Sequence, residues 1–431
     1  MLVSMRYGRG EIQVDIPDKN LVSVLKLKRT NPLETPQEAV LNALRNPIGS
    51  VPLGELAAGR QSACVVISDI TRPVPNKVIL PPILNTLEAN GIPQEQIVIL
   101  IATGIHRPNE GAELEEMVGA EIMQNYRIVN HFSHKPDTHK YLGLTRKGTP
   151  VYVDKTYLDS DLKITTALIE PHLMAGYSGG RKAICPGICS IETMKVMHGP
   201  QILEHPKATT GVIDGNPFHE EATEIAQMAG VDFIVNVAID NKRRLVGVFA
   251  GDLVDAHSAG IAFVERNAQV TLPAPVDIVL TTSAGYPLDA TFYQAIKGLV
   301  GAMDIVKPGG SIILFAECSE GIGSEPFTQL CLQTHNLEQF VEGLYDPQNF
   351  VVDQWQLEEH AKVARKANIY CYSEGIPYDV LGQLFVHPLK SPAEGIALTL
   401  ERHGSDASII AIPEGPYILP VVNNVCNQHI K

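Results

Sequence analysis

The sequence predicts an α/β protein of two domains, each built on a largely parallel sheet, with the active site in the cleft between the domains. Continuous apolar runs such as residues 63–70 and 96–104 alternate with helical segments, as strands buried on both faces of a parallel sheet do. The alternation restarts after a Pro-rich stretch at 271–275. With 431 residues, of which 45% are hydrophobic, the chain is long enough for two cores.

The first predicted domain covers residues 1–270. Its strands are expected at 11–16, 63–70, 96–104, 161–169, 232–239 and 244–251. Its helices are expected at 35–46, 77–89, 109–118, 190–198, 217–229 and 253–267. Asn90-Gly91 is typical of a helix end, and Asn109 is the expected cap of the helix that follows it.

The second predicted domain covers residues 276–404, after a linker at 271–275. Its strands are expected at 277–285, 311–317, 368–373, 383–388 and 408–413. Its helices are expected at 290–306, 326–333, 337–344, 354–367 and 392–403. The last segment, from about 405 to 431, is a candidate to return to the first domain.

Composition excludes several classes of protein. The formal charge of −14 argues against nucleic acid and anionic membranes as main partners. Seven scattered cysteines form no disulfide framework, and Cys185 and Cys189 lack the second pair of a structural zinc site. The start of the sequence lacks a signal-peptide pattern and no apolar run reaches 18 residues, so the cytoplasm is the expected location.

Polar residues gather where predicted strands end, which is where open α/β sheets bind ligands. The residues at these ends are Asp69, Ile70, Thr71, Arg72, His106, His172 and, on the helix after 277–285, Tyr293, Gln294 and Lys297. The last three are spaced to share one helical face, near the helix start if Asp289 caps it. Each also has an ordinary explanation: a turn cap, an ion pair with a surface acid, or a loop histidine. Other histidines, such as His131, His134 and His139, are expected at the surface.

Residues 170–200 combine glycines, a lysine and two histidines without strand or helix periodicity. The backbone of Ser178-Gly179-Gly180 could direct N–H groups at an anion, and Lys182 could serve as a charge or a nucleophile. His198 could instead favour the end of its helix electrostatically. Nucleotide-binding and hydrolase motifs are absent from the sequence, which disfavours a common nicotinamide dehydrogenase. Spacing alone indicates an α/β enzyme that acts on a small anion with histidine acid/base chemistry.

Five sequence elements together resemble the nickel-dependent lactate racemase family. They are DITRPVPN at 69–76, TGIHRP at 103–108, EPHLMAGYSGGRKAICPG at 170–187, His198, and YQAIKG at 293–298. The resemblance spans residues 5–415, and the SGGRK element followed sixteen residues later by a histidine is its most specific part.

The resemblance implies a cofactor, a nickel-pincer nucleotide in which a pyridinium mononucleotide holds Ni(II). It implies that Lys182 carries this cofactor covalently and that His198 supplies the fourth ligand of a square-planar nickel. It further implies acid/base roles for His106 and His172. The nucleotide would be held by Asp69, Ile70, Thr71, Arg72, Ser178, Gly179 and Gly180, and the substrate by Tyr293, Gln294, Lys297 and Trp355.

The implied reaction is racemisation or epimerisation of a 2-hydroxy acid, lactate or a related one. The hydroxyl proton goes to a histidine, the α-hydrogen leaves as hydride to the cofactor, and hydride returns to either face of the planar keto acid. The implied partners are this small substrate and the enzymes that synthesise the cofactor, and homo-oligomer formation stays open. Two alternatives remain: a carboxylate or nucleotide binding or sensor protein on the same fold, and an oxidoreductase with a diffusible nicotinamide.

Overall fold

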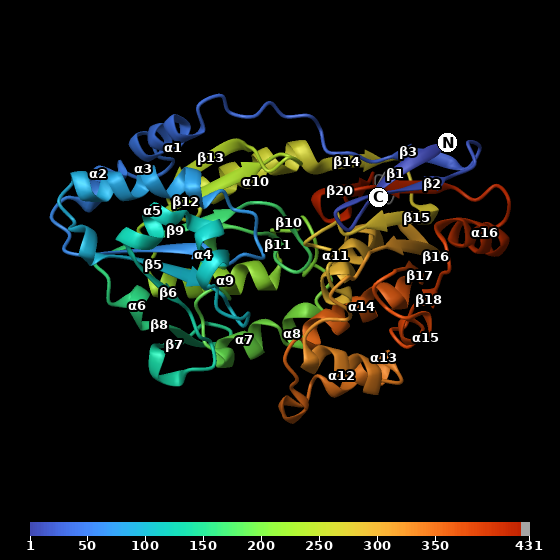
Figure 1. The fold of residues 1–431 in the computed structure, drawn as a ribbon. Helices are drawn as coiled ribbons and strands as arrows, with labels where there is room; N and C mark the ends of the chain where they lie inside the picture. Colours follow the sequence, from blue (N-terminus) through green and yellow to red (C-terminus); the bar gives the residue numbers. More distant parts are fainter. Residues whose placement is uncertain (424–431) are drawn as a thin grey trace, which may run out of the picture. The chain divides into compact units, whose positions relative to one another are not determined.

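The computed structural model describes residues 1–423, which divide into two units. Unit 1 comprises residues 1–28, 199–204 and the chain from Ala268 onward, and unit 2 comprises residues 29–198 and 205–267 (Figure 1). Each unit contains a six-stranded sheet made mainly of parallel strands. The predicted fold class, α/β with largely parallel sheets, is confirmed. No helix among the described residues is long and apolar enough to cross a membrane.

Unit 2 is organised around a sheet with the strand order β13-β12-β9-β4-β5-β6. Its strands are β4 (Ala63–Ser68), β5 (Ile97–Ala102), β6 (Arg127–Asn130), β9 (Leu162–Leu168), β12 (Phe233–Ile239) and β13 (Leu245–Gly251). Neighbours are parallel except for β12 and β13, which pair antiparallel. Val65 of β4 lies opposite Ile99 on one side and Ile164 on the other. The loops that follow the central strands β4, β5 and β9 carry the polar residues that the sequence singled out.

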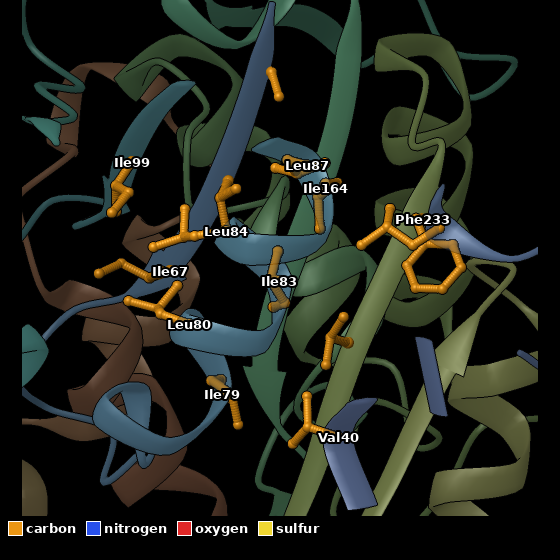
Figure 2. Close-up of a cluster of buried hydrophobic side chains, with 14 of the residues drawn as sticks. Val40, Ile67, Ile79, Leu80, Ile83, Leu84, Leu87, Ile99, Ile164 and Phe233 are labelled. Carbon is orange, nitrogen blue, oxygen red and sulfur yellow. The ribbon is translucent and has the colours of Figure 1, made fainter. Parts of the chain in front are cut away.

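The core of unit 2 lies between this sheet and α3 (Asn76–Ala89) (Figure 2). Apolar residues recur along α3 at helical spacing, and the buried ones labelled in Figure 2 are Ile79, Leu80, Ile83, Leu84 and Leu87. They pack with Ile67, Ile99, Ile164 and Phe233 of the strands. This apolar contact fixes the strand ends that carry the polar loops.

The other elements of unit 2 are shorter or peripheral. Its remaining helices are α1 (Pro36–Arg45), α2 (Leu53–Ala57), α4 (Gly111–Val118), α5 (Ala120–Asn125), α6 (Lys155–Leu158), α7 (Ile191–Met197), α9 (Pro217–Ala229) and α10 (Asp255–Ala268), whose last residue falls in unit 1. Its 3₁₀ turns are η1 (Gln94–Gln96), η2 (Pro136–Thr138) and η3 (Gly180–Ala183). Two small antiparallel pairs, absent from the sequence-based prediction, are β7 (His139–Leu144) with β8 (Pro150–Asp154), and β10 (Pro171–His172) with β11 (Gly176–Tyr177).

Unit 1 has a second parallel sheet with the order β18-β17-β16-β15-β19-β3. Its strands are β3 (Leu21–Val24), β15 (Val276–Thr282), β16 (Val306–Phe315), β17 (Asn368–Tyr372), β18 (His387–Pro388) and β19 (Ile409–Ile412). The hairpin β1 (Leu2–Tyr7) with β2 (Gly10–Asp15), and the parallel pair β14 (Gln269–Leu272) with β20 (Leu419–Val422), lie outside this sheet. The helices are α8 (Pro200–Leu203), α11 (Phe292–Met303), α12 (Glu325–Gln333), α13 (Leu337–Gly343), α14 (Gln354–Lys366), α15 (Tyr378–Leu381) and α16 (Pro392–His403). Two 3₁₀ turns, η4 (Pro347–Asn349) and η5 (Gly415–Tyr417), complete the unit.

The two units differ from the predicted domains at residues 1–28 and 199–204, which both group with unit 1. Residues 1–28 group with unit 1 because β3 pairs with β19 at the edge of the second sheet. The described part of the segment after 405 stays in unit 1 because β19 also pairs with β15, and residues 424–431 lie outside the described part. The predicted linker at 271–275 is partly a strand, since β14 extends to Leu272. Short strands such as β3 and β14 have too few residues to show a periodic pattern, so the sequence did not predict them.

Candidate active site

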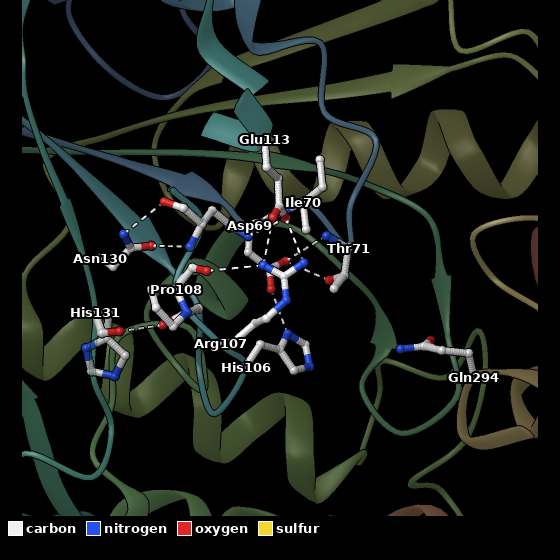
Figure 3. A network of polar contacts seen from close by, with 12 residues as sticks. Asp69, Ile70, Thr71, His106, Arg107, Pro108, Glu113, Asn130, His131 and Gln294 are labelled. Carbon is white, nitrogen blue, oxygen red and sulfur yellow. Dashed lines mark hydrogen bonds and ion pairs between the residues drawn. The ribbon is translucent and has the colours of Figure 1, made fainter. Parts of the chain in front are cut away.

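Asp69 and His106 form the central polar pair of unit 2 (Figure 3). Asp69 follows β4 and is 5% exposed, whereas the His106 side chain follows β5 and is 41% exposed. The His106 Nδ1 lies 2.6 Å from the Asp69 Oδ2. Since a carboxylate only accepts, the Nδ1 carries the proton and the lone pair of the neutral ring is on Nε2. His106 is therefore oriented as a base.

The carboxylate of Asp69 is held in its charged form. Burial alone would raise the pKa of Asp69, but His106 and the 2.6 Å bond from the Thr71 hydroxyl outweigh burial and leave this pKa lowered. The Asp69 Oδ1 also accepts the backbone N–H of Thr71. These contacts make Asp69 a support for His106 and for its own loop. The predicted role of Asp69 in holding the phosphate and ribose of a nucleotide stays a prediction.

Neighbouring polar contacts brace the loops after β4, β5 and β9. Arg72 donates to Glu170, which lies in the loop after β9. The acid that pairs with Arg72 is therefore part of the segment 170–200. Asn109 accepts the backbone N–H of Ile70 and donates to Glu113. Asn109 was the predicted cap of α4, but the capping position is Glu110, without a side-chain bond. The Asn109 side chain is used to join the β4 and β5 loops instead.

His172 lies in a different environment from His106. Its Nδ1 accepts the backbone N–H groups of Met174 and Ala175, each at 3.3 Å, and the residue is 8% exposed. An accepting Nδ1 places the proton of the neutral ring on Nε2. His106 and His172 therefore rest in opposite tautomers. For His172 to accept a proton at Nε2, its two long Nδ1 contacts must be released.

Lys182 and His198 meet at one aromatic ring. The Lys182 Nζ lies 4.6 Å from the centre of the Phe218 ring, and the His198 ring packs edge-on against Phe218 at 5.3 Å. Lys182 lies in η3 and His198 directly follows α7, so two segments sixteen residues apart converge on α9. The structure thus brings together the amine and the imidazole that the sequence singled out.

His198 has the properties of a metal ligand. Its Nδ1 lies 3.2 Å from the carbonyl oxygen of Met194, which fixes the proton on Nδ1 and the lone pair on Nε2. Burial, with the nearby Lys182 charge, lowers the pKa of His198 to about 3, so the ring stays neutral. Among residues 1–423, no three His, Cys, Asp or Glu side chains are arranged to hold a metal by themselves. A metal at His198 would need most of its ligands from a cofactor, and this donor set fits that requirement.

The Ser178-Gly179-Gly180 segment is held from within the protein. The Gly180 N–H donates to the Asn236 side chain at 2.7 Å, and the Ser178 N–H donates to the Glu170 carbonyl at 2.9 Å. The Ser178 hydroxyl donates to the Leu168 carbonyl at 2.7 Å. These contacts build the loop from within, and the expectation that the Ser178-Gly179-Gly180 segment holds a nucleotide stays a prediction. Gly179 and Gly180 both have positive φ, and an added Cβ would collide with Asn236 and His257 respectively.

Three residues of this loop support were missed at the sequence level. Asn236 is fully buried in β12, and the His257 Nε2–H donates to the Ser178 carbonyl at 2.9 Å. Arg181 is 1% exposed and donates to the carbonyls of Ala175 and Tyr177. Asn236 could have been found, because it is the single polar residue in the apolar run Phe233–Ile239. His257 lies on an ordinary amphipathic helix and gives no such signal.

The predicted substrate residues lie together in unit 1. The Lys297 Nζ donates to the Gln294 side chain at 2.5 Å, one turn apart on α11, as the predicted shared helical face requires. The Tyr293 ring packs edge-on against Phe327 at 5.1 Å. The Trp355 indole donates to the Tyr293 hydroxyl at 3.0 Å and is only 4% exposed. Trp355 therefore supports Tyr293, and its predicted place in the substrate site stays a prediction.

Two further expectations are corrected. Thr291, not Asp289, caps α11, and its hydroxyl accepts the N–H of Gln294 at 3.3 Å. His131 and His139 are buried, at 1% and 6% exposure, rather than at the surface. The His131 ring bonds to Asp154 at 2.9 Å and to the carbonyl of Cys189 at 3.0 Å, so it serves to join segments of unit 2.

Comparison with known proteins identifies the class. Family models for the lactate racemase N-terminal and C-terminal domains match residues 7–211 and 272–419. Lactate racemase of Thermoanaerobacterium thermosaccharolyticum is 31% identical over 97% of this chain and 98% of its own length. Lactate racemase of Lactiplantibacillus plantarum is 33% identical, covering 96% of this chain and 98% of that protein.

Solved structures agree with this identification. The lactate racemase apoprotein of T. thermosaccharolyticum superposes with a TM-score of 0.92 at 31% identity, covering 97% of this chain and all of that one. A Thermotoga maritima protein has a TM-score of 0.70 at 17% identity, covering 92% of this chain and all of that one, and shows the fold alone. These similarities define the chain as an isomerase of the racemase type. The chain belongs to the lactate racemase family.

Proposed function

We propose that this chain interconverts the configurations of a 2-hydroxy acid, lactate or a related 2-hydroxycarboxylate, with a nickel-pincer nucleotide attached to Lys182. The observation that carries the proposal is the convergence of the Lys182 amine and the His198 ring on Phe218. An amine for covalent attachment and a neutral imidazole for nickel are the two protein groups that such a cofactor needs. Enzymes that synthesise the cofactor are the expected maturation partners.

The cofactor would supply an electrophile that takes the α-hydrogen of the substrate as hydride and returns it to either face. The Nε2 of His106 would take the hydroxyl proton of one enantiomer, and Asp69 would stabilise the imidazolium that results. His172 would serve the opposite enantiomer after release of its contacts to the Met174 and Ala175 amides. Between these steps the substrate would be a planar 2-keto acid.

The substrate carboxylate would be bound by the Lys297 ammonium, with the Gln294 amide as a second polar contact. Their mutual hydrogen bond shows that the two head groups reach the same point, so one carboxylate could interact with both. Tyr293 would line the site, fixed by its bond from Trp355 and its packing on Phe327. These contacts distinguish hydroxycarboxylates from uncharged alcohols.

The alternative, a carboxylate or nucleotide sensor on the same fold, predicts binding without exchange of the substrate α-hydrogen. The base-ready tautomer of His106 favours turnover, because a protein that only binds needs no oriented general base.

The test begins with the protein made together with pincer-synthesis enzymes. Intact mass should show covalent cofactor, with one nickel per chain, and single-enantiomer 2-hydroxy acids should be converted on chiral chromatography. Lys182→Ala should abolish the mass increase and the activity, while Lys147→Ala, on an exposed surface lysine, should change neither. Full activity of Lys182→Ala, or ligand binding without conversion of any 2-hydroxy acid by the nickel-loaded protein, would contradict the proposal.

A further inference from the structure

The chain changes unit directly after the proposed nickel ligand. His198 ends one stretch of unit 2, and the six residues Gly199–Glu204 group with unit 1 before the chain returns at His205. We call Gly199–Glu204 the crossing segment. Since consecutive Cα atoms are about 3.8 Å apart, the position of Gly199 limits where the backbone of His198 can lie.

The crossing segment is a compact block rather than a loose loop. The N–H groups of Ile202 and Leu203 both donate to the Gly199 carbonyl at 3.0 Å, and the Glu204 N–H donates to the Pro200 carbonyl at 3.0 Å. Pro200 occupies the first helical position, where its ring restricts the backbone. Leu203 is fully buried. Hydrogen bonds therefore join the two ends of the crossing segment, Gly199 and Glu204.

The far end of the crossing segment is bound to α14 by a two-point ion pair. The Arg365 Nη1 lies 2.8 Å from the Glu204 Oε2, and the Arg365 Nη2 lies 2.9 Å from the Glu204 Oε1. The two side chains are 34% and 18% exposed, so solvent screens this pair less than a surface pair. Two parallel bonds also fix orientation, which a single lysine–carboxylate contact does not.

On its other side, His198 is held by the last turn of α7. Its backbone N–H donates to the Met194 carbonyl at 2.9 Å, and its Nδ1 bonds to the same oxygen. Gly199, the first residue of the crossing segment, directly follows this turn. His198 is therefore restrained from both directions along the chain, by α7 and by the crossing segment.

We propose that Arg365 is a positioning residue for His198, acting through Glu204 and the crossing segment, and that it holds the imidazole in place for the metal. The metal role of His198 rests on the proposed function, whereas the restraint on the α7 turn does not. Arg365 itself touches neither substrate nor cofactor in this scheme.

Arg365→Lys is the informative variant, since it keeps the positive charge and removes the fork. Its matched control is Arg244→Lys, because Arg244 also binds one acid, Asp240, through two nitrogens, at 2.6 and 2.8 Å. Amide hydrogen exchange of the full chain should become several-fold faster in Arg365→Lys over residues 194–204 and stay unchanged in α9. Arg244→Lys should leave both regions unchanged.

Unchanged exchange at 194–198 in Arg365→Lys would overturn the proposal, even if the crossing segment itself exchanged faster. If that variant does not fold, Glu204→Gln tests the pair from its other side, with the same expected and contradicting results. The double variant Glu204→Arg with Arg365→Glu should restore at least part of the protection from hydrogen exchange at 194–204. General damage to α14 would not allow this recovery. A double variant that restores no protection would also overturn the proposal.

With nickel-loaded protein, Arg365→Lys should release nickel to a chelator several-fold faster than wild type. Its kcat should fall several-fold, with KM little changed. Equal release rates would overturn the metal-positioning role. A chain that never acquires nickel would refute the proposed function instead, and the exchange experiment would still decide whether Arg365 restrains the α7 turn.

Discussion

Two buried aspartates follow central strands of the two sheets, and their partners differ. Asp69 comes directly after β4 in unit 2 and bonds to the side chains of His106 and Thr71. Asp289 lies in the loop after β15 in unit 1 and accepts the backbone N–H groups of Gly8 at 2.7 Å and Glu317 at 3.3 Å. Both carboxylates are almost inaccessible, at 5% and 0% exposure.

The difference teaches how to separate a catalytic support from a structural one. A buried carboxylate that orients a partly exposed, titratable ring acts electrostatically on a group that solvent can reach. A buried carboxylate that accepts amides fixes the backbone, and here it joins the β1–β2 hairpin to the loops of the second sheet. Equal burial and equal residue type therefore carry opposite expectations for activity and stability.

The largest expected effect is on His106, the ring that Asp69 orients. His106→Asn should lower kcat by about 10²–10⁴-fold, because the proton acceptor for one enantiomer is lost. His134→Asn, on an exposed residue of the same unit, is the control and should be close to wild type. The measurement is racemisation followed from each enantiomer by chiral chromatography with nickel-loaded protein. Activity within a factor of two of wild type would remove His106 from the mechanism.

Asp69→Asn should have a smaller effect of the same kind. The amide keeps the shape of the side chain but no longer stabilises an imidazolium on His106, so kcat should fall about 10–100-fold with KM nearly unchanged. The melting temperature should change by no more than a few degrees. A variant that melts much earlier but keeps its kcat would show that Asp69 is structural, and the contrast with Asp289 would disappear.

Asp289→Ala should show the reverse pattern. Two buried amide donors, from Gly8 and Glu317, would lose their acceptor, which should lower the free energy of unfolding by about 1–3 kcal/mol. Denaturant or thermal unfolding of the full chain measures this loss. The cofactor content per folded chain should be unaffected. Unchanged stability would mean that water replaces the carboxylate at no cost and that Asp289 does not join these loops.

Much of the scaffold was predictable because buried parallel strands and amphipathic helices have strong periodic patterns. Strands β4 and β5 and helix α3 all lie within a residue or two of their predicted bounds. The partner of a strand in space was not predictable. The placement of β3 beside β19 depends on a pairing between residues nearly 400 positions apart, which no local pattern encodes.

The site followed the same division. Asp69, His106 and His172 were singled out from their positions at strand ends, and Lys182 and His198 from residues 170–200 and the family motif; their roles stay predictions. The bond of the Gly180 N–H was not predicted, because its acceptor is Asn236, which lies far along the chain. The backbone amides of residues 178–180 were predicted to bind an anion, but the Gly180 N–H donates to the buried Asn236 side chain.

Glu358 adds a third kind of buried carboxylate to the comparison of Asp69 with Asp289. Within residues 1–423 it bonds neither to a histidine ring, as Asp69 does, nor to backbone amides, as Asp289 does. It lies on α14 and is 0% exposed, and among the described residues neither of its oxygens has a hydrogen-bond partner. Burial raises the pKa of Glu358 to about 8, with a contribution from the acids Glu359 and Glu204, against the opposing charges of Lys362 and Arg365. At neutral pH this side chain is mostly protonated.

The sign of its effect on stability follows from proton binding. An unfolded Glu358 ionises near its ordinary value of 4.5, whereas the folded one keeps its proton until about pH 8. Between these values the folded state binds more protons, so its contribution to stability, complete below pH 4.5, is lost as the pH rises. Glu358→Gln cannot ionise and should escape this loss, gaining on wild type by a few kcal/mol between pH 5 and pH 8.

Melting temperatures of wild type and Glu358→Gln across this pH range measure the gain. Glu342→Gln, on the exposed face of α13, is the control and should follow wild type at every pH. A constant difference between wild type and Glu358→Gln from pH 5 to pH 8 would mean that Glu358 is ionised in the folded protein. Glu358 would then need a bonding partner, as Asp69 and Asp289 have, and it would no longer be a third kind of buried carboxylate.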